Sequence, residues 1–555
     1  MGEPAPSPAL ASLLAAAEPA EARPLAGLVD RLRASGRLRS VVGAAGAGGT
    51  AAAAIAVRGI AYDSRRVRPG TVFVAVPGAH TDGHAHVRDA VRRGAPAIVV
   101  EREIDGLDGL DGLGVPELLV DDSQRALAPA ACWWYGDPSR DLAVVGVTGT
   151  DGKTSTCRLL TAALVAAGLP AGMSSTATLR IGGLDEPNPV HATTPEAPEV
   201  QRALRAMVLA GDRVAVLETT SHGLALDRVG GVVYDAAILT NLTHEHLEFH
   251  GSFEAYRAAK MRLFRELGGP GLGPPKGPGG ALGAAAWPRS AIVNADDPSA
   301  GPFVEAALTA GVRVVTYGET AGAAVRAVRI DEGPDGLVAD VDTPRGRLTL
   351  RLGLLGRFNA WNALAVIAFA EAVGLDLDAV LAGLAGASPV RGRMERVDRG
   401  QPFAVVVDYA HSPASLRTVL DILAPMAARG GGGLIAVFGS AGERDVAKRP
   451  MMGRIAGERC RLVVVTDEDP RGEDRDAIVA EIATGAEAAG RRRGDDLLLI
   501  ADRRDAIAAA FRAARPGDVV LLAGKGHETS IIGPHGPAPW DERRVAEQEL
   551  DRIVG

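Results

Sequence analysis

A glycine-rich segment at residues 148–155, TGTDGKTS, has the residue types that bind a nucleoside triphosphate. Glycines let backbone N–H groups close around phosphate oxygens, Lys153 neutralises their charge, and the hydroxyl of Thr154 is a ligand for magnesium. The general pattern G-x-x-x-x-G-K-[ST] is missed by one position, because Val147 stands where the first glycine is expected. A glycine turn with a chance Lys-Thr pair is the alternative, but an apolar run before the segment and a helical pattern after it favour a phosphate loop. The expected triphosphate contacts are Gly149, Thr150, Asp151, Gly152, Lys153, Thr154 and Ser155.

Two further polar residues follow apolar runs and are candidates for holding a metal. Glu218 comes directly after the run 214–217, and His246 lies just past the end of the run 236–239. Taken alone, Glu218 fits a solvent-facing strand end equally well, and His246 fits a structural histidine better than a ligand. Together with the phosphate loop, the two residues indicate phosphoryl chemistry assisted by metal ions.

Lys260 lies in a helical pattern, 253–267, on the same apolar stripe as Tyr256 and Phe264. One explanation is that its stem covers apolar surface while the amine reaches water. The other is that a desolvated, neutral amine reacts with carbon dioxide, giving a carbamate whose oxygens bind magnesium. The spacing alone does not choose between them.

These residues must be positioned by strands and helices, and the chain alternates short apolar runs with helical patterns. This alternation predicts α/β domains with parallel sheets, whose ligands bind at the carboxyl ends of the strands. Nearly every run is followed by glycine or a polar residue, as a ligand edge requires. The predicted buried strands are Leu142–Val147, Val214–Leu217, Ala236–Leu239, Ala291–Val293, Ala404–Val407, Leu434–Phe438, Leu462–Val465 and Val519–Leu522.

Breaks near Asp137-Pro138 and around 388–393 divide the 555 residues into three domains. We expect a disordered Ala/Pro-rich leader over 1–22 and an N-terminal domain over 23–139. A central domain over 140–389 then contains a mobile Gly/Pro loop at 268–288, and a C-terminal domain covers 390–555.

The charge balance limits the partners. Net charge is -8, from 60 basic and 68 acidic residues, and no long basic run favours nucleic acid or an anionic membrane. No apolar run is long enough to span a membrane, and the N-terminus lacks the pattern of a signal peptide. Cys132, Cys157 and Cys460 have no metal-type spacing. We expect a cytoplasmic monomer that uses small-molecule substrates.

Taken together, the motifs resemble the Mur ligase family from about Ala56 to Ala546. That family's phosphate loop is TGTxGKT, which accounts for the shifted glycine. Its Glu-Ser-Ser-His segment is matched at 218–222, its Thr-Asn-Leu-x-x-x-His-Leu segment at 240–247, and its carbamylated lysine by Lys260. The resemblance implies two magnesium ions, one held by Thr154 and Glu218 and the other by His246 and carbamylated Lys260.

Later motifs match the same family and imply its architecture. The segment 356–362 resembles the adenine contact, with Asn359, and the resemblance implies that Arg393 reaches the phosphates and Asp408 the ribose. It also implies a small N-terminal α/β domain that binds UDP, a central P-loop ATPase-like domain and a Rossmann-like C-terminal domain. The implied catalytic residues are Lys153, His246, Lys260 and Arg393.

Within the family, residues in each of the three predicted domains resemble the MurE type, whose acceptor is UDP-MurNAc-L-Ala-D-Glu. Those of the N-terminal and central domains imply acceptor contacts at Ser64, Ala79, His80, Thr81, Thr193, Thr194, Thr220 and Arg228. Those of the C-terminal domain imply a diamino-acid pocket made of Arg444, Glu468, Asp469, Pro470, Arg471, Gly524 and Glu528. Thr220 replaces a usual serine but keeps the hydroxyl, and Leu226 stands where some relatives have glutamine.

The resemblance implies ATP-dependent amide formation through an acyl phosphate, adding the third amino acid of a peptidoglycan precursor. Arg471 suits the distal carboxylate of meso-diaminopimelate, whereas Asp469, in place of the usual asparagine, suits the plain ammonium of lysine or ornithine. A folylpolyglutamate synthase-like ligase is the nearest rival. It lacks the UDP-binding N-terminal domain, so the residues from Ala56 to Asp137 argue against it. A P-loop NTPase without ligase activity is the rival from another class.

Overall fold

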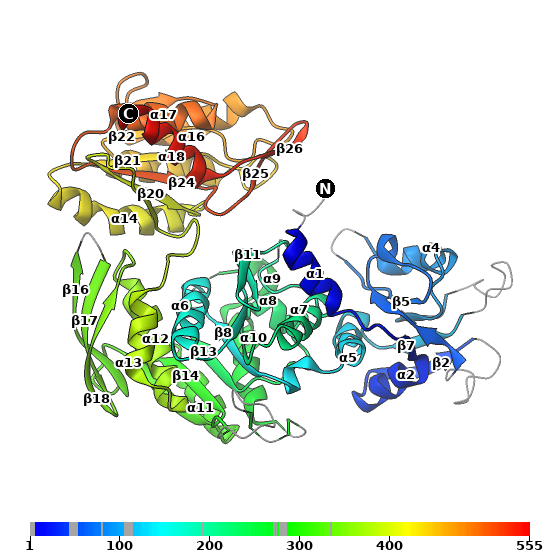
Figure 1. Cartoon of the computed structure of the whole chain (residues 1–555). Coiled ribbons are helices and arrows are strands. Elements are labelled where there is room, and N and C mark those ends of the chain that lie inside the picture. The colour runs from blue at the N-terminus through cyan, green and yellow to red at the C-terminus, as the bar shows by residue number, and fades with distance from the viewer. Residues whose placement is uncertain are drawn as a thin grey trace.

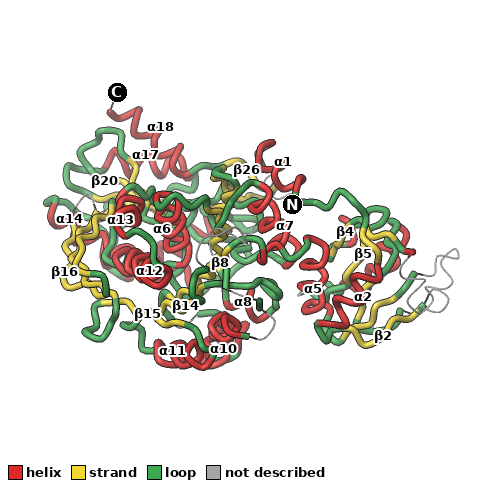
Figure 2. The backbone as a smooth tube through the Cα atoms, turned by 60° about the horizontal axis from the view of Figure 1, so that its bottom comes forward, coloured by secondary structure: helices red, strands yellow, loops and turns green. Residues whose placement is uncertain are grey.

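The computed structural model describes residues 6–43, 54–78, 81–104, 115–190, 192–243, 245–269, 272–273, 275–276, 286–333 and 336–554. Three sheets follow one another along the chain, and Figure 1 shows the N-terminal and C-terminal lobes on different sides of a larger central body. A turned view again places the N-terminal lobe at one side of the central body, which it adjoins where α5 meets α7 (Figure 2). This is the three-domain α/β architecture predicted from the sequence, although the domain limits themselves stay a prediction.

The N-terminal sheet has five strands in the order β2-β7-β6-β5-β4, parallel except for β2. Its strands are β2 (Leu38–Val42), β4 (Gly59–Ala61), β5 (Thr71–Val74), β6 (Ile98–Val100) and β7 (Glu117–Val120). Its helices are α2 (Leu25–Ala34), α4 (Val87–Arg92) and α5 (Ser123–Tyr135), and a short ladder pairs β1 (Arg23–Pro24) with β3 (Ala56–Val57).

The central sheet has eleven strands in the order β11-β10-β9-β12-β8-β13-β14-β15-β16-β17-β18. Its parallel part contains β9 (Ala171–Ser174), β12 (Val214–Glu218), β8 (Ala143–Thr148), β13 (Ala236–Leu239), β14 (Ser290–Asn294), β15 (Arg313–Gly318) and β16 (Val325–Gly333). Antiparallel strands extend both edges: β10 (Thr178–Ile181), β11 (Leu184–Pro187), β17 (Gly336–Thr343) and β18 (Gly346–Leu352). The sequence did not predict these extensions.

Two hydrophobic cores sandwich the central sheet. The helices α6 (Lys153–Ala166), α12 (Phe358–Val373) and α13 (Leu377–Ala385) cover one face. The other face is covered by α7 (Ala197–Leu209), α10 (Phe253–Arg265) and α11 (Ala300–Thr309). Two short helices, α8 (Ser221–Ala225) and α9 (Leu247–His250), follow β12 and β13 at the ligand edge.

The C-terminal sheet has the order β19-β20-β24-β21-β22-β23, parallel from β20 to β23. Its strands are β19 (Glu395–Val397), β20 (Ala404–Asp408), β21 (Leu434–Phe438), β22 (Leu462–Val465), β23 (Leu497–Leu499) and β24 (Val519–Ala523). One face packs on α14 (Pro413–Arg429), α15 (Lys448–Arg459) and α16 (Arg475–Ala488), and the other on α17 (Arg503–Ala513) and α18 (Glu542–Val554). A hairpin of β25 (Ser530–Gly533) and β26 (Gly536–Pro539) follows β24.

All eight predicted buried strands are confirmed, each within one residue at either end. The disordered leader is wrong for the described part of 1–22, because α1 (Pro8–Ala16) packs on α7 with Leu10 fully buried. Composition alone hid this helix, although Ser7 caps it and Pro8 starts it. Most of the predicted loop at 268–288 lies outside the described residues.

Candidate active site

The glycine-rich loop joins β8 to α6 and is shaped by two glycines that no other residue can replace. Gly149 and Gly152 have φ of 148° and 80°. A Cβ at Gly149 would lie 1.9 Å from Thr240 Oγ1, and one at Gly152 would lie 2.4 Å from Asn362 Oδ1. The loop therefore turns with its backbone pressed against its neighbours, ending at the N-terminus of α6, where backbone N–H groups favour an anion.

The segment after β13 fixes this loop in place. The backbone N–H of Thr150 donates to Asn241 O, and that of Asp151 to Asn241 Oδ1, both at 2.9 Å. Thr240 Oγ1 donates to Asp151 O at 2.6 Å. Lys153 Nζ donates to Thr150 O at 2.6 Å, so the ammonium group lies over the loop. The arrangement is that of a preorganised anion cradle.

Thr154 and Glu218, predicted as partners at a metal, lie side by side. Thr154 Oγ1 donates to Glu218 Oε2 at 2.9 Å, and the same carboxylate oxygen accepts from the Thr176 N–H at 2.9 Å. Glu218 is 3% exposed. A hydroxyl and a buried carboxylate beside a phosphate cradle are the oxygen ligands that magnesium prefers. The donor chemistry therefore fits the expected ion.

Lys260 is 2% exposed, so the idea that its amine reaches water is wrong. Its Nζ donates to Gly149 O at 2.6 Å and lies 4.6 Å from the centroid of the Tyr256 ring. Burial lowers the pKa of the Lys260 amine well below its usual value, and the charge of Lys153 lowers it further, against the opposing pull of nearby carboxylates. This shift favours the neutral form of the amine, which carbamate chemistry requires.

His246 also lies near Tyr256. Its ring centroid is 6.5 Å from that of Tyr256 and 4.7 Å from that of His222. The Tyr256 hydroxyl is 2.9 Å from Thr150 Oγ1, which connects it to the phosphate loop. Sequence reasoning placed Tyr256 on the apolar stripe of Lys260 but missed this bridging role. Within the described ranges, no three His, Cys, Asp or Glu side chains gather around a metal position, and the expected ligand set includes a threonine and a modified lysine instead.

The predicted acceptor residues of the central domain form one hydrogen-bonded group next to Glu218. Thr194 Oγ1 donates to Glu218 O, and the Thr220 N–H and hydroxyl both contact Thr194 Oγ1, all at 3.0 Å. Thr193 Oγ1 accepts from Thr176 Oγ1 at 3.0 Å. Arg228 donates to Thr194 O at 3.1 Å. The hydroxyls thus form a network that reaches the backbone carbonyl of Glu218, and the Arg228 guanidinium lies against the same segment.

In the N-terminal domain, Ser64 and Thr81 lie at two turns that flank α4. Ser64 is buried and starts a 3-10 turn, Ser64–Arg66, and Thr81 Oγ1 lies 3.2 Å from His86 Nε2 in the second turn. Both turns pack against α4. Ala79 and His80, predicted with them, lie outside the described residues.

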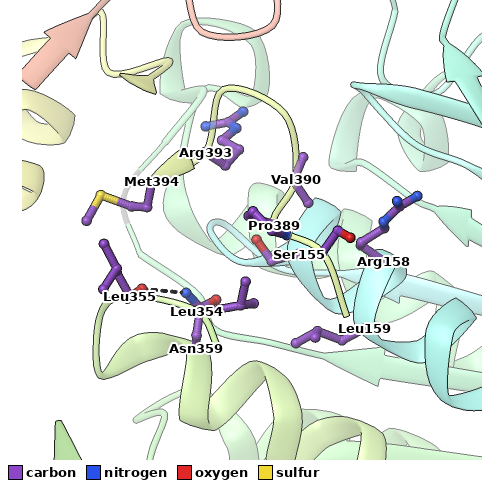
Figure 3. Close-up of a pocket in the computed structure, with 11 residues that line it drawn as sticks. Ser155, Arg158, Leu159, Leu354, Leu355, Asn359, Pro389, Val390, Arg393 and Met394 are labelled. Atoms are coloured by element: carbon purple, nitrogen blue, oxygen red, sulfur yellow. Dashed lines mark hydrogen bonds between the residues drawn. The ribbon is translucent and has the colours of Figure 1, made fainter. Parts of the chain in front are cut away.

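Ser155, Asn359 and Arg393 line one pocket between α6, α12 and the segment that enters the C-terminal domain (Figure 3). Asn359 Nδ2 donates to Leu355 O at 2.7 Å, which holds the turn before α12. The guanidinium carbon of Arg393 lies 5.0 Å from the centroid of the Tyr409 ring. The pocket brings together residues from both domains that were predicted to contact one nucleotide.

Asp408 ends β20, but its carboxylate is engaged with backbone. One oxygen accepts from the Met394 N–H and the other from the Ala410 N–H, both at 2.8 Å. Burial raises the pKa of Asp408, and the charge of Arg393 opposes that shift. This carboxylate thus ties the Arg393 turn to the sheet; its contact with ribose stays a prediction.

A third group of predicted residues meets at the carboxyl ends of β22 and β24. Asp469 Oδ1 accepts from Lys525 Nζ at 2.7 Å and from the Ile532 N–H at 2.8 Å. Lys525, which the predicted site omitted, is fully buried and also pairs with Glu528. Glu468 differs from Glu528 in its hydrogen bonding, because its Oε2 atom is buried without a hydrogen-bond partner among the described residues.

The remaining members of this group are Gly524, Arg471, Pro470 and Arg444. A Cβ at Gly524 would lie 3.5 Å from the Glu468 carboxyl. Arg471 has φ of 55° and donates its backbone N–H to Ile532 O at 2.8 Å, which fixes the turn after Pro470. Arg444 is exposed, and its place in an amino-acid site stays a prediction. The pocket is rich in charge of both signs, as a zwitterionic amino acid requires.

Comparison with known families matches three segments of the chain. The Mur ligase family catalytic domain matches residues 56–133, the Mur ligase middle domain 147–370, and the Mur ligase glutamate ligase domain 392–526. A UDP-N-acetylmuramyl-tripeptide synthetase of Roseiflexus sp. is 49% identical over 90% of this chain and 95% of its own. The chain belongs to the Mur ligase family. Membership confirms the resemblance noted from the motifs and the ligase class, against the alternative of a P-loop NTPase without ligase activity.

Other relatives of this Mur ligase carry a more specific name. A UDP-N-acetylmuramoyl-L-alanyl-D-glutamate--2,6-diaminopimelate ligase of Geobacter metallireducens is 40% identical over 89% of this chain and 94% of its own. A solved structure with the same name superposes with a TM-score of 0.61 at 28% identity, covering 90% of this chain and 96% of that one. A folylpolyglutamate synthase of Mycobacterium tuberculosis, at 18% identity and a TM-score of 0.54, shares the fold over 78% of this chain. No described helix is long and apolar enough to cross a membrane.

Proposed function

We propose that this Mur ligase adds meso-diaminopimelate to UDP-MurNAc-L-Ala-D-Glu, consuming ATP and releasing ADP and phosphate. The γ-phosphoryl group would pass to the D-glutamate carboxylate, and the amine of the incoming amino acid would displace phosphate from the acyl phosphate. Its relatives carry names for this reaction, and the chain spans nearly their whole length. Because the reaction consumes ATP, we also propose a cytoplasmic, monomeric enzyme.

The observation that carries this proposal is the meeting of three groups at one edge of the central sheet. The phosphate loop follows β8, and the Thr154–Glu218 pair joins the start of α6 to the end of β12. Lys260 reaches Gly149 from α10. A phosphate cradle, buried oxygen ligands and a neutral amine together suit phosphoryl transfer better than any one of them alone.

Each residue in this group has a distinct task. Lys153 and the loop amides would bind the phosphates, and Arg393 would approach them from the C-terminal domain to offset developing charge. Magnesium, when bound, supplies charge neutralisation and holds reacting oxygens in line. Thr154 and Glu218 would hold one ion, and His246 with carbamylated Lys260 the other. Thr193, Thr194, Thr220 and Arg228 would orient the acceptor carboxylate beside them.

The amino-acid pocket supports diaminopimelate through Arg471, whose turn is fixed by Ile532 while Asp469 is occupied by Lys525. A fixed Asp469–Lys525 pair removes much of the reason to expect that Asp469 selects a substrate ammonium. Lysine and ornithine remain the competing substrates, because Glu468 and Glu528 offer carboxylates to an ammonium group.

Phosphate release by the purified enzyme tests the proposal. It should require both UDP-MurNAc-L-Ala-D-Glu and a diamino acid, and diaminopimelate should outperform lysine and ornithine in parallel reactions. Equal release without the UDP-dipeptide would contradict the ligase assignment. A preference for lysine or ornithine would keep the ligase and replace only the amino acid.

A further inference from the structure

A fully buried ion pair lies beneath the amino-acid pocket, between α17 and α18. Arg503 and Glu542 are 2% and 1% exposed. Arg503 Nε donates to Glu542 Oε2 at 2.9 Å, and Arg503 Nη2 donates to Glu542 Oε1 at 2.6 Å. Trp540 Nε1 also donates to Glu542 Oε2, at 2.6 Å. The carboxylate therefore holds the guanidinium in one orientation.

The rest of the Arg503 guanidinium is directed at two backbone carbonyls. Its Nη1 donates to Asp467 O at 2.9 Å and its Nη2 to Ala523 O at 2.8 Å. Asp467 directly precedes the pocket segment 468–471, and Ala523 directly precedes the pocket segment 524–528. One side chain thus fixes the points at which both pocket segments leave the sheet.

The sheet itself does not join these two points. In the strand order β20-β24-β21-β22, β21 lies between β22 and β24, so the two strands share no backbone hydrogen bonds. Their carboxyl ends are connected by Arg503 below and by the Lys525–Asp469 ion pair above. The backbone joins β22 and β24 only indirectly, through β21, and Arg503 and the Lys525–Asp469 ion pair add direct links between the segments that leave the two strands.

A second pair ties the same two strands at their opposite ends. Arg461, just before β22, donates from Nε to Asp518, just before β24, at 3.1 Å to each carboxylate oxygen. Asp518 is 2% exposed, and its Oδ1 also accepts from the Gly433 N–H at 2.8 Å. This pair links the same two strands through an arginine, but it is less buried than Arg503–Glu542 and lies at the opposite end of the strands, so it provides a control for effects at the pocket segments.

We propose that Arg503 is a positioning residue for the amino-acid pocket, setting the distance between the segments 468–471 and 524–528. The proposal rests on the function proposed above. A lysine at 503 would keep the charge and the pairing with Glu542, but a single ammonium cannot reproduce the fork that spans two carbonyls and a carboxylate. The pocket would then lose its spacing while the domain keeps its ion pair.

The test compares Arg503→Lys with Arg461→Lys, the same substitution at the two ends of the same strands. Arg503→Lys is expected to raise KM for the diamino acid about tenfold, because small displacements of binding groups are costly. KM for ATP and for the UDP-dipeptide should stay within about twofold, and kcat at saturating diamino acid should change little. Arg461→Lys should lower Tm less, because Arg461 is partly exposed, and should leave all three KM values unchanged.

Several outcomes would overturn the proposal. Equal changes in all three KM values, or an unchanged KM for the diamino acid in folded Arg503→Lys, would show a merely structural role. If Arg503→Lys does not fold, Glu542→Gln, whose amide can accept only one of the two guanidinium hydrogen bonds and so leaves Arg503 less firmly held, serves instead. It should raise only the same KM. A wild-type enzyme that needs no diamino acid would contradict the proposed function instead.

Discussion

Two buried lysines at the ligand edges of two parallel sheets have opposite surroundings. Lys260 of the central domain touches a carbonyl and an aromatic ring, and among the described residues it has no carboxylate at ion-pair distance. Lys525 of the C-terminal domain touches the carboxylates of Asp469 and Glu528. Both are at most 2% exposed. Burial alone therefore does not decide what a lysine does.

The difference lies in whether the ammonium charge is compensated. An uncompensated buried amine gives up its proton and becomes a nucleophile, which is the state that reacts with carbon dioxide. A buried lysine that contacts two carboxylates is held by ion pairs and acts as a fixed cross-link. We thus expect Lys260 to be chemically reactive and Lys525 to have a structural role.

The largest expected effect follows from removing Lys260. Lys260→Ala should lower kcat about 10³-fold, because the ligand set of one metal ion and its charge stabilisation are lost. Added acetate or formate should restore part of the activity by replacing the carbamate oxygens. Phosphate release measures both effects. Lys525→Ala is the matched control, and rescue of that variant by the same anions would remove the distinction between the two lysines.

Replacing Glu218 should give the second-largest loss of activity. Glu218→Gln keeps the hydrogen bonds from Thr154 and Thr176 within reach but removes the negative charge, so kcat should fall about 10²-fold. The magnesium concentration needed for half-maximal activity should rise as well. A titration of activity against magnesium separates the two effects. Unchanged magnesium dependence would place the metal elsewhere.

Replacing Lys525 should cost stability. Lys525→Met leaves Asp469 and Glu528 as uncompensated carboxylates and should lower the free energy of unfolding of the C-terminal domain by about 3 kcal/mol. Chemical denaturation followed by circular dichroism measures it. A stability equal to that of the wild type would mean that the ion pair contributes nothing there.

Lys260→Met, in contrast to Lys525→Met, should raise the free energy of unfolding. The pKa of Lys260 is lowered in the folded state, so the unfolded chain binds more protons between the folded pKa and the usual lysine value. The penalty is full below the folded pKa and disappears as pH rises toward the usual value. Lys260→Met should therefore stabilise the apoenzyme in buffer free of carbon dioxide, most at neutral pH and least near pH 10. Denaturation at several pH values checks this, and a destabilised variant would contradict it.

Much of the central site was predictable from the sequence, because it is built from local patterns. A buried strand followed by glycine and lysine sets the phosphate loop, and helical spacing put Lys260 on the buried stripe. Even the strand limits came within one residue, since apolar runs bounded by polar residues leave little choice of register.

What escaped prediction depends on contacts between distant segments. Tyr256 shares the helical stripe of Lys260, but its contact with Thr150 and the pairing of Lys525 with Asp469 join segments that are far apart in the sequence. The helix α1 was missed for a different reason, because an Ala/Pro-rich composition masked the Ser7 cap and the buried Leu10.

Carbon-13 NMR of the enzyme equilibrated with ¹³C-bicarbonate tests the central claim about Lys260 most directly. The account predicts one carbamate resonance in the wild type that persists in Lys525→Met and disappears in Lys260→Met. A wild-type spectrum without that resonance, or one that survives the loss of Lys260, would contradict it.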